Sequence, residues 1–103
     1  MTWADVSLRT FQDALASSAP TPGGGSAAGV ALGQAAALAV MVSDLTLGNE
    51  TLREGWSISE QVKTIAIPML EEGLNLATED SEAFDKVVDI AKTSCLRSIT
   101  KNS

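Results

Sequence analysis

A long uncharged stretch in the first half of the chain decides the fold. It reads Ser26-Ala-Ala-Gly-Val-Ala-Leu-Gly-Gln-Ala-Ala-Ala-Leu-Ala-Val-Met-Val-Ser43. Its length raises the question of a transmembrane helix. However, it is rich in Ala and Gly, contains Gln34, lacks Lys and Arg at its ends and is followed by Asp44. A helix that is apolar on all sides is also typical of the buried centre of a helical protein. We therefore predict a buried helix of a soluble protein, and no membrane partner.

Small residues recur along this stretch at helical spacing. Gly25, Gly29 and Gly33 lie four residues apart, and Ala36 and Ser43 fall near the same face. Such a face lets the backbone of another helix approach closely. Because each glycine inside a helix costs roughly 1 kcal/mol relative to alanine, interior glycines usually have a packing reason. Two interpretations stay open, a tight helix–helix contact within one subunit and a seam for self-association.

The sequence before and after this stretch supplies helix boundaries. Ser7 is a suitable N-cap for a first helix, which Pro20 and Pro22 end because each disfavours helical geometry in the preceding residue. The central helix is expected from about Ser26 to Leu47, with Gly48 at its C-terminus.

A third helix follows a polar connection. Ser57 and Glu60 form the sequence pattern of a capping box, and the helical pattern continues to about Ala91 with a kink or break near Pro68. Residues 93–103 lose the pattern and are expected to form a loose tail. No segment alternates apolar and polar residues as a half-buried strand does. We predict an all-α fold, an antiparallel bundle of three to four helices.

Composition restricts the chemistry. The chain has 103 residues, enough for one domain, and seven basic against thirteen acidic residues give a net charge of −6, which argues against nucleic-acid binding. It has no His and a single Cys, Cys95, so His-based catalysis and multi-Cys metal sites are excluded and we expect no metal. One cysteine suits a reducing compartment, and the N-terminus lacks the pattern of a secretory signal, so we expect a cytoplasmic protein.

A Pro- and Gly-rich run precedes the central helix. It reads Ala19-Pro-Thr-Pro-Gly-Gly-Gly-Ser-Ala-Ala28. Bare backbone followed by the free N–H groups of a helix start is a physical site for an anion or a carbonyl oxygen. No Lys-Ser or Lys-Thr follows and no strand precedes it, so it is neither a Walker loop nor a dinucleotide fingerprint. On spacing alone, a plain turn between helices is the favoured interpretation.

Asp80 has an unusual position on the third helix. At about 100° per residue it falls near the centre of an apolar arc, so we expect it to face inward. The arc consists of Leu76, Ala77, Ala83, Phe84, Val87 and Ala91. A buried carboxylate is costly unless it is paired or hydrogen-bonded. Asp80 is therefore either a candidate acid or base, or a structural carboxylate that accepts backbone N–H bonds or pairs with Arg53 or Lys63.

Three segments together resemble a known family. They are residues 7–28, residues 41–48 (Met-Val-Ser-Asp-Leu-Thr-Leu-Gly) and residues 79–84 (Glu-Asp-Ser-Glu-Ala-Phe). Their order and spacing are similar to those of the cyclodeaminase/cyclohydrolase family, the C-terminal domain type of formiminotransferase-cyclodeaminase that also occurs as methenyltetrahydrofolate cyclohydrolase. The resemblance implies that residues 1–92 are the N-terminal half of the family's helical domain and that residues 93–103 are a divergent tail.

The resemblance implies an enzyme of tetrahydrofolate one-carbon metabolism, a hydrolase or a lyase with a folate-type substrate and no cofactor. One version closes 5-formiminotetrahydrofolate to 5,10-methenyltetrahydrofolate with release of ammonia, and the other hydrolyses the methenyl compound to 10-formyltetrahydrofolate. Asp80 would stabilise the cationic methenyl bridge and move protons between water, N10 and the leaving ammonia. The residues expected to bind the substrate are Pro22, Gly23, Gly24, Gly25 and Ser26.

Two other roles stay open beside the enzyme. One is a truncated, non-catalytic helical subunit that acts in oligomerisation, and the other is a membrane-associated helix. Because a small chain with so much apolar helix needs further burial, we expect a homodimer or a higher homo-oligomer.

Overall fold

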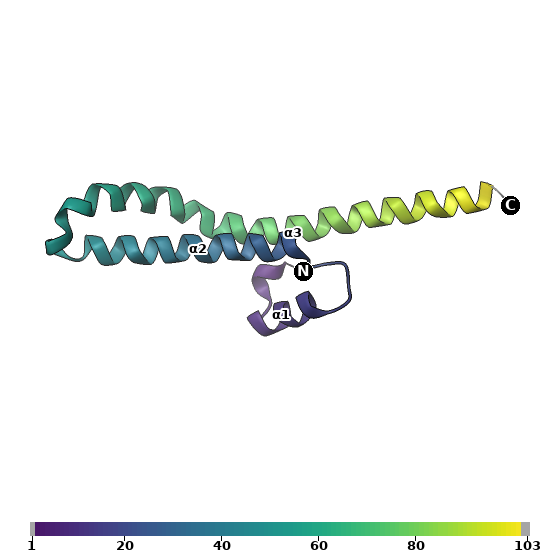
Figure 1. The fold of residues 1–103 in the computed structure, drawn as a ribbon, viewed down its shortest axis with the longest axis horizontal. Coiled ribbons are helices and arrows are strands. Elements are labelled where there is room, and N and C mark those ends of the chain that lie inside the picture. The colour runs from purple at the N-terminus through teal and green to yellow at the C-terminus, as the bar shows by residue number, and fades with distance from the viewer. Residues whose placement is uncertain (1, 102–103) are drawn as a thin grey trace.

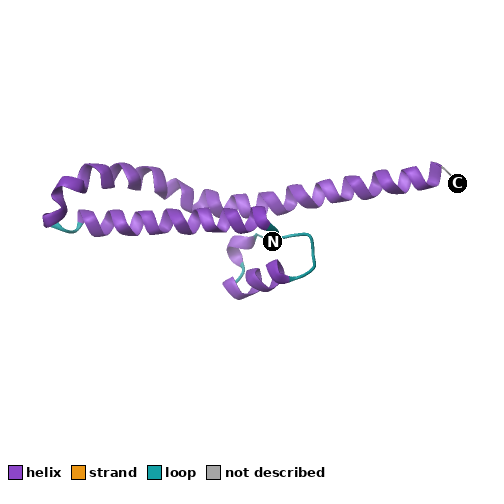
Figure 2. Ribbon diagram, in the orientation of Figure 1, coloured by secondary structure: helices purple, strands orange, loops and turns teal. Residues whose placement is uncertain are grey.

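The chain folds into a long helical hairpin with a short helical segment at its side (Figure 1). The computed structural model describes the backbone of residues 2–101 and the side chains of residues 2–94. Its elements in chain order are η1 (Trp3–Asp5), α1 (Leu8–Ala16), α2 (Gly24–Leu47), η2 (Glu50–Gly55) and α3 (Trp56–Lys101). Residues 2–101 contain no strand, as Figure 2 shows, so the predicted all-α class is confirmed.

The predicted caps at Ser7 and Gly48 agree with the structure, whereas α1 already ends at Ala16, before Pro20. Ser7 caps α1, because its Oγ accepts a hydrogen bond from the backbone N–H of Thr10 at 3.0 Å. Gly23 is the N-cap of α2, which therefore begins two residues before the expected start. Gly48 is the C-cap of α2, and its N–H donates to the carbonyl of Asp44.

The small residues of α2 pack against α3. The buried residues of α2 are Ser26, Gly29, Gly33, Ala36 and Ser43. A Cβ added to Gly29 would lie 2.8 Å from the backbone N of Ala77, and one added to Gly73 would lie 2.6 Å from the backbone N of Gly33. The contact within one subunit is therefore the correct interpretation of the glycine spacing. Gly73 is its counterpart on α3, which the sequence pattern did not indicate.

The start of α3 differs from the prediction. Asn49 caps η2 by accepting from the N–H of Thr51 at 3.0 Å, and η2 continues directly into α3 at Trp56. Ser57 is thus already inside the helix, and the predicted capping box with Glu60 is wrong. The indole of Trp56 fixes this end of the hairpin instead, because its Nε1 donates to the carbonyl of Thr46 at 2.8 Å.

The far end of α3 also differs from the prediction. Pro68 lies inside the helix, so the predicted break is absent, whereas the change of direction in the first half of α3 agrees with the predicted kink (Figure 1). The helix then continues to Lys101, so the loose tail expected from residue 93 is wrong for the described backbone. The physical reason is that no Gly or Pro follows Gly73, and nothing therefore ends the helix. This end extends beyond the hairpin (Figure 1).

The hairpin has two unequal sides. Residues that follow a buried position, such as Val30, Gln34 and Leu74, face the N-terminal segment, which they meet in a cavity shared with Trp3 and Phe11. Residues that precede a buried position lie on the opposite side, which we call the open face. Its apolar members are Ala28, Leu32, Val42, Ile58, Ile65 and Leu76. No described element covers this face.

Only one side of α2 is buried, where a wholly buried helix was expected. The exposed residues of its second half include Leu38, Met41, Val42 and Leu45. By length and composition alone α2 could cross a membrane, a property that core helices of soluble proteins share.

Candidate functional site: a groove between the start of α2 and the middle of α3

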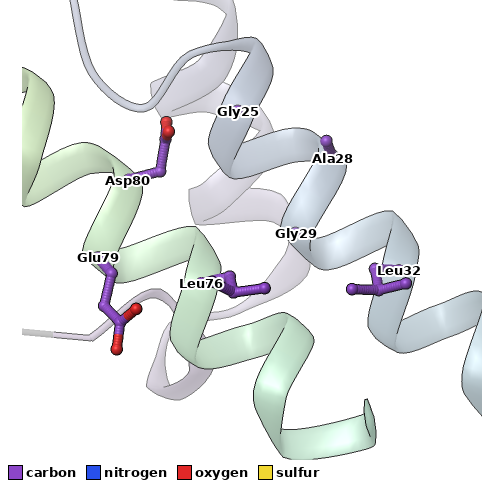
Figure 3. Close-up of a pocket in the computed structure, with 7 residues that line it drawn as sticks. All are labelled: Gly25, Ala28, Gly29, Leu32, Leu76, Glu79 and Asp80. Atoms are coloured by element: carbon purple, nitrogen blue, oxygen red, sulfur yellow. The ribbon is translucent and has the colours of Figure 1, made fainter. Parts of the chain in front are cut away.

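A shallow groove lies on the open face. Its volume is about 440 Å³. It is lined by Gly25, Ala28, Gly29, Leu32, Leu76, Glu79 and Asp80 (Figure 3). The first four of these residues come from the first turns of α2 and the others from two turns of α3. The groove therefore has apolar walls with Asp80 on the α3 side, whereas Figure 3 shows the Glu79 carboxylate directed away from α2.

Gly25 and Asp80 meet at one end of this groove. The Asp80 side chain lies so close to Gly25 that a Cβ at that position would overlap its carboxylate. Figure 3 shows the Asp80 side chain directed towards the first turn of α2. The first N–H groups of a helix have no acceptor within the helix, and the positive end of the helix dipole favours a carboxylate there. The pairing of the Gly-rich run with Asp80 is thus a feature of the folded chain.

The expected burial of Asp80 is wrong, because its carboxylate is exposed. The apolar arc around it is real, but Ala77 is its only buried member among the described side chains, where α2 packs against it at Gly29. Leu76 is 40% exposed, Phe84 48% and Val87 62%. Helical periodicity placed Asp80 on the apolar side of α3, and that side belongs to the open face.

The structural alternatives for Asp80 are partly resolved. Lys63 pairs with Asp44, with 2.7 Å between Nζ and Oδ1, and Arg53 pairs with Glu50 at 3.5 Å. The hydrogen bond and the charge of Asp44 raise the pKa of the Lys63 ammonium above its usual value. Neither cation pairs with Asp80, so that interpretation is wrong. A structural role at the start of α2 and a catalytic role in the groove both stay open.

The predicted substrate-binding residues differ in whether they are exposed, line the groove or are buried. Gly25 lines the groove, whereas Pro22 is buried beside it, after a cis peptide bond with Thr21. Gly23 caps α2, and Gly24 is exposed in its first turn. Ser26 is fully buried, with its Oγ donating to the carbonyl of Ala77 at 2.7 Å. Its side chain therefore has a structural role and leaves no surface for a ligand.

Sequence reasoning missed part of the site. Leu32, Leu76 and Glu79 line the groove, and only their helical register relative to Gly33 and Ala77 could have indicated this. It also missed Trp3, whose indole Nε1 donates to Ser81 Oγ at 3.0 Å behind the groove. Among the described side chains, no group of three His, Cys, Asp or Glu residues is placed to hold a metal ion.

The fold and the groove define a class of protein, an all-α domain that sets a carboxylate beside a Gly-rich helix start. The family model for formiminotransferase-cyclodeaminase matches residues 7–97, and the chain belongs to this family. The match covers α1, α2, η2 and most of α3, and thus both sides of the groove.

A curated relative agrees with this assignment. Over 81 residues the chain is 41% identical to the methenyltetrahydrofolate cyclohydrolase of Methylorubrum extorquens, an alignment that covers 79% of this chain and 39% of the relative. The chain thus corresponds to about two fifths of that protein's length. No solved structure matches the chain.

Proposed function

We propose that this chain acts in tetrahydrofolate one-carbon metabolism, on the bridge carbon between N5 and N10, in the groove beside Asp80. The observation that carries the proposal is the approach of the Asp80 carboxylate to Gly25, which joins the two most informative motifs in one site. The name of the Methylorubrum relative favours hydrolysis of 5,10-methenyltetrahydrofolate over the cyclodeaminase reaction.

The chemistry needs a carboxylate and little else. The methenyl bridge is a delocalised cation, and a carboxylate held near it lowers the energy of the charged ground state and of the water adduct. Water adds to the bridge carbon and gives up a proton, the bond from this carbon to N5 breaks, and N5 takes up a proton. In this proposal Asp80 accepts the proton of the attacking water and returns one to nitrogen. The apolar walls formed by Leu32 and Leu76 suit the flat pterin ring.

The N–H groups at the start of α2 would bind an oxygen of the substrate. Gly24 and Gly25 are the first two residues of the helix and are exposed, and such N–H groups bind carbonyl oxygens and anions. A pterin carbonyl or the carboxylate of the glutamate tail is the ligand that we assign to them. Because the net charge of −6 opposes an anionic tail, these local donors must supply the attraction.

We also propose that a second copy of the chain covers the open face. The chain exposes 7422 Å², whereas a folded monomer of 10.7 kDa exposes about 5,500 Å². Two copies that each buried this surplus of about 1,900 Å² would form an interface of the size of obligate homodimers, about 2,000–5,000 Å² in total. Such a partner would also cover the groove and exclude water from it.

The test of the enzymatic proposal is turnover by the purified chain. Hydrolysis of 5,10-methenyltetrahydrofolate is followed by absorbance beside a blank for the spontaneous reaction. We expect a rate clearly above the blank. A folded chain, shown by circular dichroism, that does not exceed the blank and releases no ammonia from 5-formiminotetrahydrofolate would instead support the non-catalytic helical subunit.

A further inference from the structure

A chain of hydrogen bonds crosses the hairpin directly behind the groove. Trp3 Nε1 donates to Ser81 Oγ at 3.0 Å, and Ser81 Oγ lies 2.6 Å from Ser26 Oγ. Ser26 Oγ in turn donates to the carbonyl of Ala77 at 2.7 Å. Ser26 is fully buried and Ser81 is 5% exposed, so the two contacts of Ser26 form away from water, whereas the bond from Trp3 is partly buried.

The chemical types of the two end groups fix the direction in which these hydrogen bonds are donated. An indole N–H only donates and a carbonyl only accepts, while each hydroxyl has one proton. Since Ser26 uses its proton on Ala77, Ser81 must donate to Ser26. Every proton is then used once and points the same way, from Trp3 to Ala77. Hydrogen bonds aligned in this manner strengthen one another, and a buried network with all its members satisfied is rigid.

The residues of this hydrogen-bond network are the sequence neighbours of the residues in the proposed site. Ser26 directly follows Gly25, and Ser81 directly follows Asp80. The bond between the two hydroxyls therefore sets the distance between the helix turns that carry Gly25 and Asp80. Two further hydrogen bonds hold the same region. One runs from Thr21 Oγ1 to Asp85 Oδ1 at 2.8 Å, and the other from the backbone N–H of Trp3 to Thr78 Oγ1 at 3.0 Å.

We propose that Trp3 and Ser81 are positioning residues for Asp80. They touch neither the groove nor a substrate within it, and they hold the Asp80 carboxylate at the start of α2 through Ser26. The N-terminal segment thereby acts on a site on the opposite side of the hairpin. The catalytic part of this inference rests on the proposed function, whereas the placement of the carboxylate does not.

The test compares two tryptophan variants. Trp3→Phe keeps an aromatic ring against Phe11, whose ring centroid lies 5.5 Å from that of Trp3, and removes the indole donor together with part of the ring system. Trp56→Phe is the matched control, because it removes an indole donor at the far end of the hairpin. We expect Trp3→Phe to shift the carboxyl carbon resonance of Asp80 and the control to leave it unchanged. Ser26→Ala should shift the indole N–H resonance of Trp3 but not that of Trp56.

Kinetics then separate positioning from folding. At equal folded fraction, we expect kcat of Trp3→Phe and of Ser81→Ala to fall about tenfold or more with KM nearly unchanged, because small misplacements of a reacting group are costly. The control should stay within about twofold of the wild type. An unmoved Asp80 resonance in Trp3→Phe, or an equal effect of Trp56→Phe on that resonance or on kcat, would overturn the proposal. If the wild type is inactive while the resonance moves, the proposed function fails and the positioning of Asp80 stands.

Discussion

Gly25 leaves the space that the Asp80 carboxylate occupies, and this makes the pair testable. In Gly25→Ala the new methyl group would displace the carboxylate, which is exposed and can turn away at a cost of about 1 kcal/mol. The helical preference of alanine offsets that cost. We therefore expect a melting temperature near that of the wild type and a clear loss of turnover. Gly24→Ala is the control, because it keeps the backbone N–H at this position and its Cβ meets nothing within 4 Å. Equal turnover in the two variants would contradict the site.

Asp80 itself is expected to be essential for turnover and dispensable for folding. Asp80→Asn keeps the size of the side chain and removes its charge and its basicity. Because the side chain is exposed, stability should change by less than about 0.5 kcal/mol, while the rate should fall about hundredfold or more. Glu79→Gln, on the same wall of the groove, is the matched control and should retain most activity. Unchanged turnover in Asp80→Asn, measured by the same absorbance assay, would refute the assignment.

At the scale of elements, the contact between α2 and α3 depends on backbone approach at glycine. A Cβ on Gly73 would lie 2.6 Å from the N of Gly33 and 2.7 Å from the O of Gly29, and these backbone atoms cannot turn away. We expect Gly73→Ala to lower the free energy of unfolding by about 1–3 kcal/mol in spite of its better helix propensity. Gly33→Ala, whose nearest contact is 3.3 Å from the O of Leu70, should cost less. Urea unfolding monitored by circular dichroism measures both, and a stabilised Gly73→Ala would contradict the packing.

The elements that the sequence predicted well are those defined by local chemistry. The cap at Ser7, the end of α2 at Gly48 and the small-residue face of α2 each depend on neighbours within a few residues. The start of α3 was wrong because the indole of Trp56 binds the carbonyl of Thr46, ten residues earlier in the chain. Gly73 was missed because a single glycine has no period, and only its partner helix shows its purpose.

At the scale of the whole molecule, the helical periodicity of the sequence located the apolar face of α3 but not the element that covers it. It placed Asp80 among apolar residues, which the structure confirms, and inward, which it does not, because α1 and η1 pack on the other side of the hairpin. The two site motifs were found from sequence, but their approach was not, since it depends on the register between α2 and α3. That register is set by the glycine contacts and by Ser26 and Ser81, which lie 55 residues apart in sequence.

The open face gives the last prediction. Ile65 precedes buried Ala66 and lies on the open face, 67% exposed, whereas Ile67 follows Ala66 on the other side, 48% exposed. If a second copy covers the open face, Ile65→Lys buries a charge in the interface and should convert the dimer to monomer. Ile67→Lys makes the same chemical change outside the interface and should remain dimeric.

Size-exclusion chromatography with light scattering measures the mass of each variant. A monomeric wild type would overturn the proposal that a second copy covers the open face. A dimer that both variants retain would place the interface elsewhere. A dimer lost only in Ile65→Lys would place the interface on the open face, which also carries Leu76 of the groove.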